Sequence, residues 1–236
     1  MTRRRWIADE VSENRAALTG TNAAHLSRVL RARVGQRFDI ACGDQLRLGT
    51  IASINDERVE FELGETLAAP SSLNIILLLA IFKFDRLEWA IEKCTELGAS
   101  RIVPVIARRT EQHLAAAAAK RVERWRRIAH EASQQSRRLS PPAIDDPMKL
   151  KQALTIEAAT KLLLNETEQR FSLRDALANE SPEPVALAIG PEGGWTADEI
   201  ELFHSAGWQS VTLGATILRA ETAAIASLGA VASLLE

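Results

Sequence analysis

Short segments in the first 70 residues alternate between apolar and polar side chains. Residues 38–42, 46–54 and 58–63 show the period of two that is typical of half-buried β-strands. Between these segments stand Gly43-Asp44 and Asn55-Asp56, whose residue types favour tight turns. The pattern therefore predicts a small β-rich unit at the start of the chain.

One segment of this first part has helical spacing instead. Residues 25–33 place Leu26, Val29 and Leu30 on one predicted face, with arginines around it. Residues 68–72 contain proline and serines and are predicted to be a linker. We therefore expect one helix beside the strands and a domain boundary close to residue 70.

The period changes after the predicted linker. Residues 74–81 form a continuous apolar run, as expected of a strand buried on both faces, and residues 85–97 have helical spacing with Gly98 placed to end the helix. Further apolar strands are predicted at 102–106, 161–164, 185–189 and 210–213, separated by helices at 120–138, 196–206 and 222–235. Strands that alternate with helices predict a mostly parallel sheet covered on both faces. The expected organisation is a β domain at 1–70 followed by an α/β domain at 73–236.

Composition agrees with a globular protein that has a sizeable core. Of 236 residues, 46% are hydrophobic and 25% are charged. No apolar stretch follows the first residues, and the apolar segment at 222–235 is too short to span a bilayer, so we expect a cytoplasmic protein with no membrane association. The two cysteines and four histidines lack metal-ligand spacing, so no metal is expected.

The net charge of −2 hides an uneven distribution. Residues 1–37 hold eight arginines against three acids, and residues 101–138 hold ten Lys or Arg against three acids. Residues 139–201 reverse this balance, with twelve acids against five bases. A solvated helix face explains one such run well, but two separate basic segments in an acidic protein favour contact with nucleic acid.

The most informative segment is Gly190-Pro-Glu-Gly-Gly194. It directly follows a predicted buried strand, and Thr196 and Glu199 have the spacing of a capping box for the next helix. Glycines allow backbone amides to approach a ligand, and in open α/β sheets ligands bind at the carboxyl ends of strands. The segment differs from the GxGxxG and Walker patterns, which speaks against dinucleotide and P-loop enzymes.

Two other strand ends carry polar residues. Leu213-Gly214 is followed by Arg219 and Glu221, which are charged residues among small and apolar ones. Because burial of an unpaired charge is costly, each of these two side chains is expected to have an ion-pair partner or a functional role. The predicted strand at 161–164 is followed by Asn165 and Glu166. The signal from Asn165 and Glu166 is weak on its own.

These motifs resemble those of a known family. Gly190-Pro-Glu-Gly-Gly194 with Thr196 and Glu199, and the segment from Leu213 to Ala223, are similar to the cofactor loops of the 16S rRNA uracil-N3 methyltransferases, the RsmE-like family of the SPOUT superfamily. Upstream segments at 25–31, 83–98, 108–110 and 131–137 match in the same order. The resemblance therefore extends over nearly the whole chain.

The resemblance implies a fold, an activity and an assembly. It implies an N-terminal PUA-like β-barrel for RNA binding and a C-terminal SPOUT domain whose mostly parallel sheet is tied in a trefoil knot. It implies transfer of a methyl group from S-adenosylmethionine to N3 of a uridine in 16S rRNA of the small ribosomal subunit. It also implies a homodimer with cofactor sites near the subunit interface.

Site residues follow from the same motifs. Arg219 is the expected catalytic group for negative charge on the uracil oxygens, and Glu192 or Glu221 is expected to take or relay the N3 proton. The expected cofactor-binding residues are Asn165, Glu166, Gly190, Pro191, Glu192, Gly193, Gly194, Leu213, Gly214, Ile217 and Leu218. The expected phosphate-binding residues are Arg3, Arg4, Arg5, Arg28, Arg31, Arg109, Arg124, Arg127, Arg137 and Arg138.

Three alternatives remain open from the sequence. A non-catalytic ribosome-assembly factor would explain the basic segments but would leave the glycine-containing loops without a task. A small-molecule enzyme would use those loops but leave the basic segments idle. A SPOUT enzyme that methylates another RNA atom, such as a ribose 2′-hydroxyl, would use both.

Overall fold

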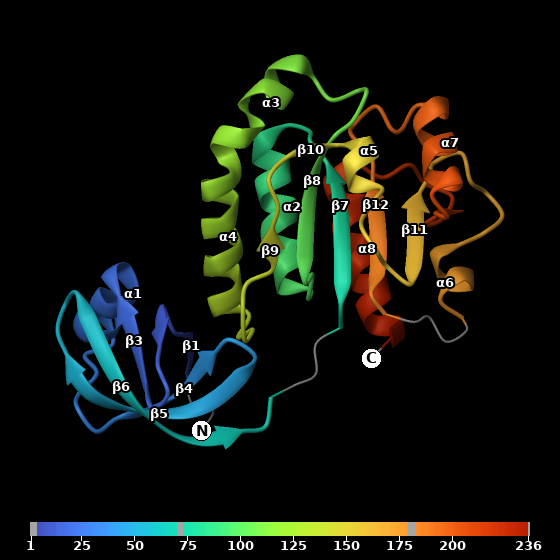
Figure 1. The fold of residues 1–236 in the computed structure, drawn as a ribbon. Coiled ribbons are helices and arrows are strands. Elements are labelled where there is room, and N and C mark those ends of the chain that lie inside the picture. Colours follow the sequence, from blue (N-terminus) through green and yellow to red (C-terminus); the bar gives the residue numbers. More distant parts are fainter. Residues whose placement is uncertain (1–3, 70–72, 179–182, 236) are drawn as a thin grey trace. The chain divides into compact units, whose positions relative to one another are not determined.

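A computed structural model describes residues 4–69, 73–178 and 183–235, and the proposed RNA contact Arg3 lies outside these ranges. The chain divides into two compact units (Figure 1). The smaller unit comprises residues 1–71 together with 133–141, and the larger unit comprises 72–132 and 142–236. Leu139 belongs to the smaller unit because it packs against buried Ile7, Ala41 and Leu46.

The smaller unit contains one six-stranded sheet in the order β1-β4-β5-β6-β3-β2. Its strands are β1 (Arg5–Ile7), β2 (Glu10–Val11), β3 (Arg15–Thr19), β4 (Arg37–Cys42), β5 (Gln45–Ile54) and β6 (Arg58–Leu67). All neighbouring pairs are antiparallel except β1 and β4, which are parallel. The three predicted strands are confirmed as β4, β5 and β6, and Gly43, with φ of +68°, forms the predicted turn between the first two.

The predicted helix of this unit is partly wrong. Helical structure begins earlier, with α1 (Gly20–Ala24), and continues as a π-helical turn, η1 (His25–Val29). Leu26 is fully buried as expected, whereas Val29 is 65% exposed. A π turn closes hydrogen bonds five residues apart, as the Leu30 amide does with the His25 carbonyl, so side chains rotate away from the 3.6-residue period on which the prediction rests.

The larger unit contains a sheet with the order β10-β8-β7-β12-β11-β13, in which β9 also pairs with β8. Its strands are β7 (Ile75–Ala80), β8 (Arg101–Ile106), β9 (Ala143–Ile144), β10 (Met148–Lys149), β11 (Thr160–Leu164), β12 (Val185–Ile189) and β13 (Gln209–Val211). Every pairing is parallel, which confirms the predicted α/β class and parallel sheet.

Helices cover both faces of this sheet, as predicted (Figure 1). One face packs against α2 (Phe84–Glu96), α3 (Gln112–Ala117), α4 (Val122–Gln135), α6 (Leu173–Ala176) and α8 (Ala220–Leu235). The other face packs against α5 (Leu150–Ala153) and α7 (Ala197–Ser205). The alternation is visible in β7, where Leu77 and Leu79 belong to the first core and Leu78 to the second.

One helix prediction for the larger unit differs from the structure in detail. The continuous helix expected at 120–138 is not observed over its full length. Its first two residues belong to the 3-10 turn η2 (Ala118–Arg121), which connects α3 to α4, and α4 ends at Gln135. Arg137 has φ of +59°, which lies outside the right-handed helical region and is incompatible with continuation to residue 138. Gly98, with φ of +106°, ends α2 as predicted.

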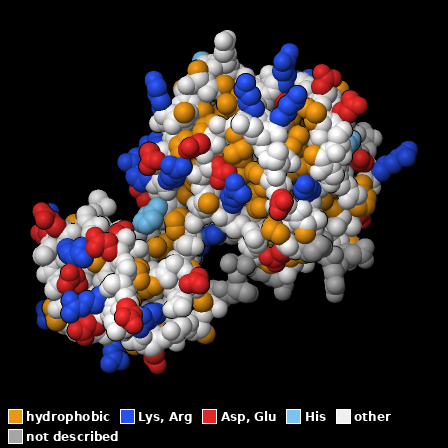
Figure 2. Space-filling model, in the orientation of Figure 1, with side chains coloured by type: hydrophobic (Ala, Val, Ile, Leu, Met, Phe, Trp, Pro, Cys, Tyr) orange, Lys and Arg blue, Asp and Glu red, His pale blue; other side chains and the backbone are white. Residues whose placement is uncertain are grey.

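The described surface carries charges of both signs. Figure 2 shows basic and acidic side chains next to one another on the visible face of each unit. Among the described helices, none combines the length and apolar character needed to cross a membrane. In the described part of the chain, no three His, Cys, Asp or Glu side chains gather so as to hold a metal ion.

Candidate active site

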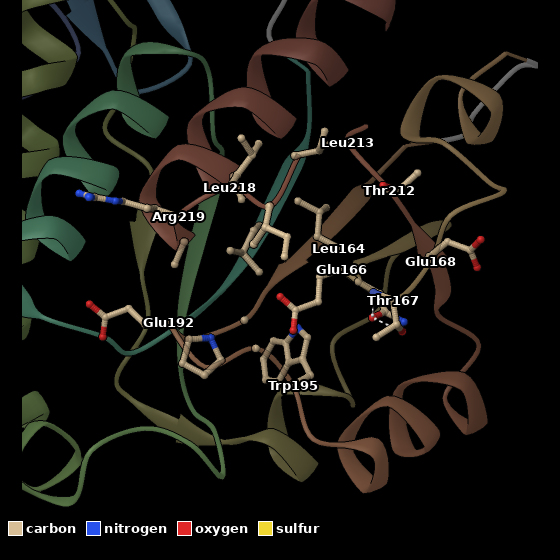
Figure 3. A pocket seen from close by; sticks show the side chains of 18 of the residues that line it. Leu164, Glu166, Thr167, Glu168, Glu192, Trp195, Thr212, Leu213, Leu218 and Arg219 are labelled. Carbon is tan, nitrogen blue, oxygen red and sulfur yellow. Dashed lines mark hydrogen bonds between the residues drawn. The ribbon is translucent and has the colours of Figure 1, made fainter. Parts of the chain in front are cut away.

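A pocket of about 1090 Å³ opens at the carboxyl ends of three adjacent strands of the larger unit. The segments that follow β11, β12 and β13 form most of its wall, and Lys83 and Arg86 at the start of α2 complete it (Figure 3). Pockets for small ligands commonly measure about 300–1,000 Å³. The three polar strand ends predicted from the sequence therefore meet at one cavity of suitable size.

The glycine loop, residues 190–194, follows β12 and is tightly folded. The Gly194 amide donates to the Pro191 carbonyl (2.8 Å), and Gly194 has φ of +70°, in the left-handed region. A Cβ atom at Gly194 would lie 2.8 Å from Glu166 Oε1, and one at Gly190 would lie 3.2 Å from the Trp195 ring. Glycine at these two positions allows the loop to approach both neighbours closely.

Glu199 anchors the end of this loop. Its side chain is buried, and its Oε1 accepts from the Arg108 amide (2.7 Å) while Oε2 accepts from the Thr196 amide (2.9 Å). The Thr196 hydroxyl accepts in turn from the Glu199 amide (3.3 Å), which confirms the predicted capping box. One side chain therefore joins the glycine loop, the start of α7 and the end of β8.

We expect Glu199→Ala to lower the free energy of unfolding by about 3 kcal/mol, because it leaves two part-buried backbone amides without their charged acceptor. Chemical denaturation monitored by tryptophan fluorescence measures this change. Glu201→Ala, at an exposed position of the same helix, is the matched control and is expected to change stability by about 0.5 kcal/mol or less. Equal losses in the two variants would contradict the anchoring role.

Apolar side chains form the centre of the pocket. Figure 3 shows Leu164, at the end of β11, and Leu213 and Leu218, from the segment after β13, at the cavity. Ile217 also lines the pocket and is 81% exposed, which is unusual for a large aliphatic side chain. Such exposed apolar surface beside a cavity suits a flat apolar or aromatic ligand group.

The structure brings together almost all predicted cofactor residues. Ten of the eleven line the pocket, and the exception is Gly193. A Cβ atom at Gly193 would lie 3.2 Å from Arg109 Cδ, so this glycine faces the arginine rather than the cavity. The Arg109 guanidinium donates to the Gly193 carbonyl, which places the arginine as a support of the glycine loop.

The three candidate catalytic residues have different positions. Arg219 and Glu192 line the pocket, and Figure 3 shows both on its left side. Glu221 is not among the lining residues, and its side chain is 6% exposed in the first turn of α8. Arg86 lies close to both acids, with Nη1 3.4 Å from Glu192 Oε1 and Nε 3.8 Å from Glu221 Oε1.

Sequence reasoning missed several lining residues. Thr167 and Glu168 directly follow the predicted Asn165 and Glu166, and backbone amides of Arg170 and Phe171 lower the pKa of Glu168. The pocket is also lined by Lys83, Arg86, Trp195 and Thr212. Most of these stand just beyond the end of a predicted strand, so a wider window after each strand would have found them.

The proposed phosphate-binding arginines fall into several groups. Arg28 pairs with Asp56 (2.7 Å) and Arg124 with Glu88 (2.8 Å), whereas Arg4, Arg31 and Arg127 are exposed. The Arg5 guanidinium donates to the Arg137 carbonyl within the smaller unit. Arg138 is partly buried, and burial lowers its pKa. Exposed ion pairs contribute only about 0–1 kcal/mol, so Arg28 and Arg124 remain available to a phosphate.

Comparison with known proteins identifies relatives over the whole chain. A family model described as an RNA methyltransferase domain matches residues 69–232. Ribosomal RNA small subunit methyltransferase E from Synechocystis is 35% identical, over 97% of this chain and 76% of its own length. The protein of the same name from Rickettsia conorii is 32% identical, over 96% of this chain and 93% of its own.

Solved structures agree with these relatives. Ribosomal RNA small subunit methyltransferase E from Neisseria gonorrhoeae, bound to S-adenosylmethionine, superposes with a TM-score of 0.85 at 30% identity, over 98% of both chains. A putative methyltransferase from Legionella pneumophila, also in complex with this cofactor, gives 0.84 at 28% identity, over 99% of this chain and 98% of that one.

Proposed function

Because this chain belongs to the RNA methyltransferase family that includes ribosomal RNA small subunit methyltransferase E, we propose that it methylates N3 of a uridine in 16S rRNA, using S-adenosylmethionine. The observation that supports this most is the pocket, in which the three predicted loops meet. Two structural relatives that align over 98% of their own chains carry that cofactor. Family membership favours an enzyme over a non-catalytic assembly factor.

Two features of the pocket support this cofactor. Gly194 leaves open a space next to Glu166 that a Cβ atom would fill. Glu166, Glu168 and Glu192 add carboxylates to the wall, which suits a ligand with cationic groups. Ile217 and Leu218 are proposed to hold the adenine. The remaining contacts are proposed to come from Asn165, Gly190, Pro191, Gly194, Leu213 and Gly214, whereas Gly193 faces Arg109.

The proposed reaction makes clear demands on the protein. S-adenosylmethionine supplies a methyl group activated by attachment to a positively charged sulfur. The uracil must be presented unpaired, since N3 is otherwise occupied in base pairing. The protein must also help N3 lose its proton and stabilise the negative charge that then spreads to the uracil oxygens.

Arg219 is proposed to stabilise that negative charge. It is exposed at the pocket, and among the described residues no ion pair or side-chain hydrogen bond engages its guanidinium. A planar cation with several donors is well suited to carbonyl oxygens. Its position just before α8 allows the helix to fix its backbone, since its carbonyl accepts from the Ala223 amide (2.8 Å).

The smaller unit is proposed to be a PUA-like β-barrel that binds RNA. Its six-stranded sheet and its exposed arginines Arg4, Arg28 and Arg31 support this assignment. On the larger unit, Arg124 and Arg127 of α4 are proposed to contact phosphates as well. Such contacts require binding that weakens steeply as salt concentration rises, and a flat salt response would exclude them.

Two features of the whole enzyme are proposed from family membership. The first is a trefoil knot around the segments that form the pocket, and a crystallographic trace through residues 160–236 would test it. The second is a cytoplasmic homodimer. Trp89 (47% exposed) and Leu97 (36%) near α2, with Leu234 (46%) on the packed helix α8, provide apolar surface for a partner copy. Sedimentation of the wild type and of Trp89→Glu would test dimerisation.

Calorimetry and mass spectrometry test the proposed function together. We expect one S-adenosylmethionine to bind per chain, and we expect small ribosomal subunits that lack the modification to gain 3-methyluridine in 16S rRNA. Absence of both results would contradict the proposal. Formation of a 2′-O-methyl nucleotide instead would keep the cofactor and reassign the target atom.

A further inference from the structure

Three charged side chains, those of Arg86, Glu192 and Glu221, form a connected group at one side of the pocket, and a fourth, Arg219, lies close by in the chain. Arg86 contacts Glu192 through Nη1 (3.4 Å) and Glu221 through Nε (3.8 Å), and Arg219 lies two residues before Glu221 in the chain. Figure 3 shows Arg219 and Glu192 on the same side of the cavity. The group therefore links the glycine loop, the start of α2 and the start of α8.

The two acids of this group differ in accessibility. The Glu192 side chain is 32% exposed and lines the pocket, whereas the Glu221 side chain is 6% exposed and does not. Within the described part of the chain, Glu221 Oε2 is buried without a hydrogen-bond partner. Glu192 is therefore the acid that a substrate base can reach, and Glu221 lies beneath Arg86.

Arg86 connects these two acids. Its side chain is only 34% exposed, and its two contacts come from different edges of the guanidinium. A buried carboxylate strongly favours a nearby cation, because an unpaired charge in that place is costly. Glu221 therefore fixes Arg86, and Arg86 in turn fixes the side chain of Glu192 at the pocket wall.

The chemistry of the target base matches this arrangement. The Watson–Crick edge of uracil presents two carbonyl acceptors with one N–H donor, N3–H, between them. A complementary wall offers a carboxylate acceptor accompanied by guanidinium donors, which is what Glu192, Arg86 and Arg219 supply. Cytosine differs at the decisive position, because its N3 is an acceptor and would face the carboxylate without a shared proton.

We propose that Glu192, held in place by Arg86, recognises the N3–H of the target uracil and accepts its proton. The N3–H bond breaks and the proton passes to a Glu192 carboxylate oxygen. The N3 electron pair forms the new bond to the methyl carbon while the bond between that carbon and sulfur breaks. Glu192 is then a catalytic residue that also selects uracil over cytosine, and Arg86 is a positioning residue.

This inference rests on the proposed function and is tested with the Glu192→Gln variant on two RNAs. Small subunits are reconstituted with 16S rRNA transcribed with either uridine or 5-fluorouridine, whose N3–H is more acidic. Rates of N3 methylation are measured at saturating S-adenosylmethionine and divided by the wild-type rate on the same substrate, which cancels effects of fluorine on assembly. Asp198→Asn, an exposed acid outside the pocket lining, is the matched control.

We expect Glu192→Gln to be about a hundredfold slower than the wild type on uridine RNA, the usual contribution of a general base. On 5-fluorouridine RNA the rate deficit of Glu192→Gln is expected to be about tenfold smaller, because the more acidic N3–H loses its proton more easily without a general base. Arg86→Lys keeps the positive charge but cannot contact Glu192 and Glu221 at the same time through two edges of a guanidinium. Its rate on uridine RNA is expected to fall less than that of Glu192→Gln, and this deficit is also expected to be smaller on 5-fluorouridine RNA.

Equal deficits of Glu192→Gln on both RNAs would overturn the proposal, since a merely structural role does not depend on the acidity of N3. A deficit no larger than that of Asp198→Asn would also overturn it. Inactivity of the wild type on uridine RNA would overturn the proposed function itself, and the wild-type reaction therefore separates the two failures.

Discussion

Replacing Arg219 with alanine is expected to slow uridine methylation by about a hundredfold to a thousandfold while S-adenosylmethionine binds with nearly unchanged affinity. Removal of one donor that stabilises a developing negative charge has an effect of this size in other enzymes. The exposed guanidinium makes no ion pair or side-chain hydrogen bond within the described residues, so its removal leaves no buried partner unsatisfied. The loss therefore reports chemistry rather than folding.

Single-turnover rates and calorimetric titration separate the two effects. Arg219→Lys keeps the positive charge but loses the planar fork of donors, so it is expected to recover only part of the rate. Arg174→Ala, an exposed arginine on α6 outside the pocket lining, is the matched control and is expected to behave like the wild type. A normal rate for Arg219→Ala would remove Arg219 from the mechanism.

Periodicity predicted five strands of the larger sheet and three of the six strands of the smaller one, because burial along these strands is regular. β7 is buried at every position and reads as a continuous apolar run, and β5 alternates over much of its length. Five strands were not predicted, namely β1, β2 and β3 of the smaller sheet and β9 and β10 of the larger one. β9 and β10 have two residues each, which are too few to show a period. They exist because they pair with β8, which is a tertiary effect.

The parts of the candidate site that consist of backbone groups and of residues at strand ends could be predicted from the sequence. Glycine spacing and the capping box located the loop after β12, and the other two loops followed from strand ends. Which strands lie side by side was not predictable from alternation alone. The order places β12 between β7 and β11, and this brings the start of α2 to the glycine loop. The contact between Arg86 and Glu192 depends on that order.

Partners of charged side chains were the least predictable feature. Arg109 was expected to bind phosphate, yet its guanidinium lies against the Gly193 carbonyl. A basic run in the sequence identifies the charges without showing which way each side chain turns. For the same reason the sequence could not decide whether Glu192 or Glu221 takes the N3 proton. In the structure the two side chains differ clearly in burial.

Replacing Gly194 with valine is expected to weaken S-adenosylmethionine binding by about a hundredfold or more. The φ of +70° is strained for a β-branched residue, and the new Cβ would lie 2.8 Å from Glu166 Oε1. Relief of both conflicts requires the loop and the Glu166 side chain to move. Loss of three hydrogen bonds of about 1 kcal/mol each would be enough for this change in affinity.

Gly43→Val is the matched control for backbone strain. Gly43 has φ of +68°, nearly the same as Gly194, but lies in a turn of the smaller unit with no atom within 4 Å of its added Cβ. Both variants are expected to lose some thermal stability, and only Gly194→Val is expected to lose cofactor affinity in calorimetric titration. Similar weakening of binding in both variants would show that global destabilisation, rather than the shape of the glycine loop, controls the affinity.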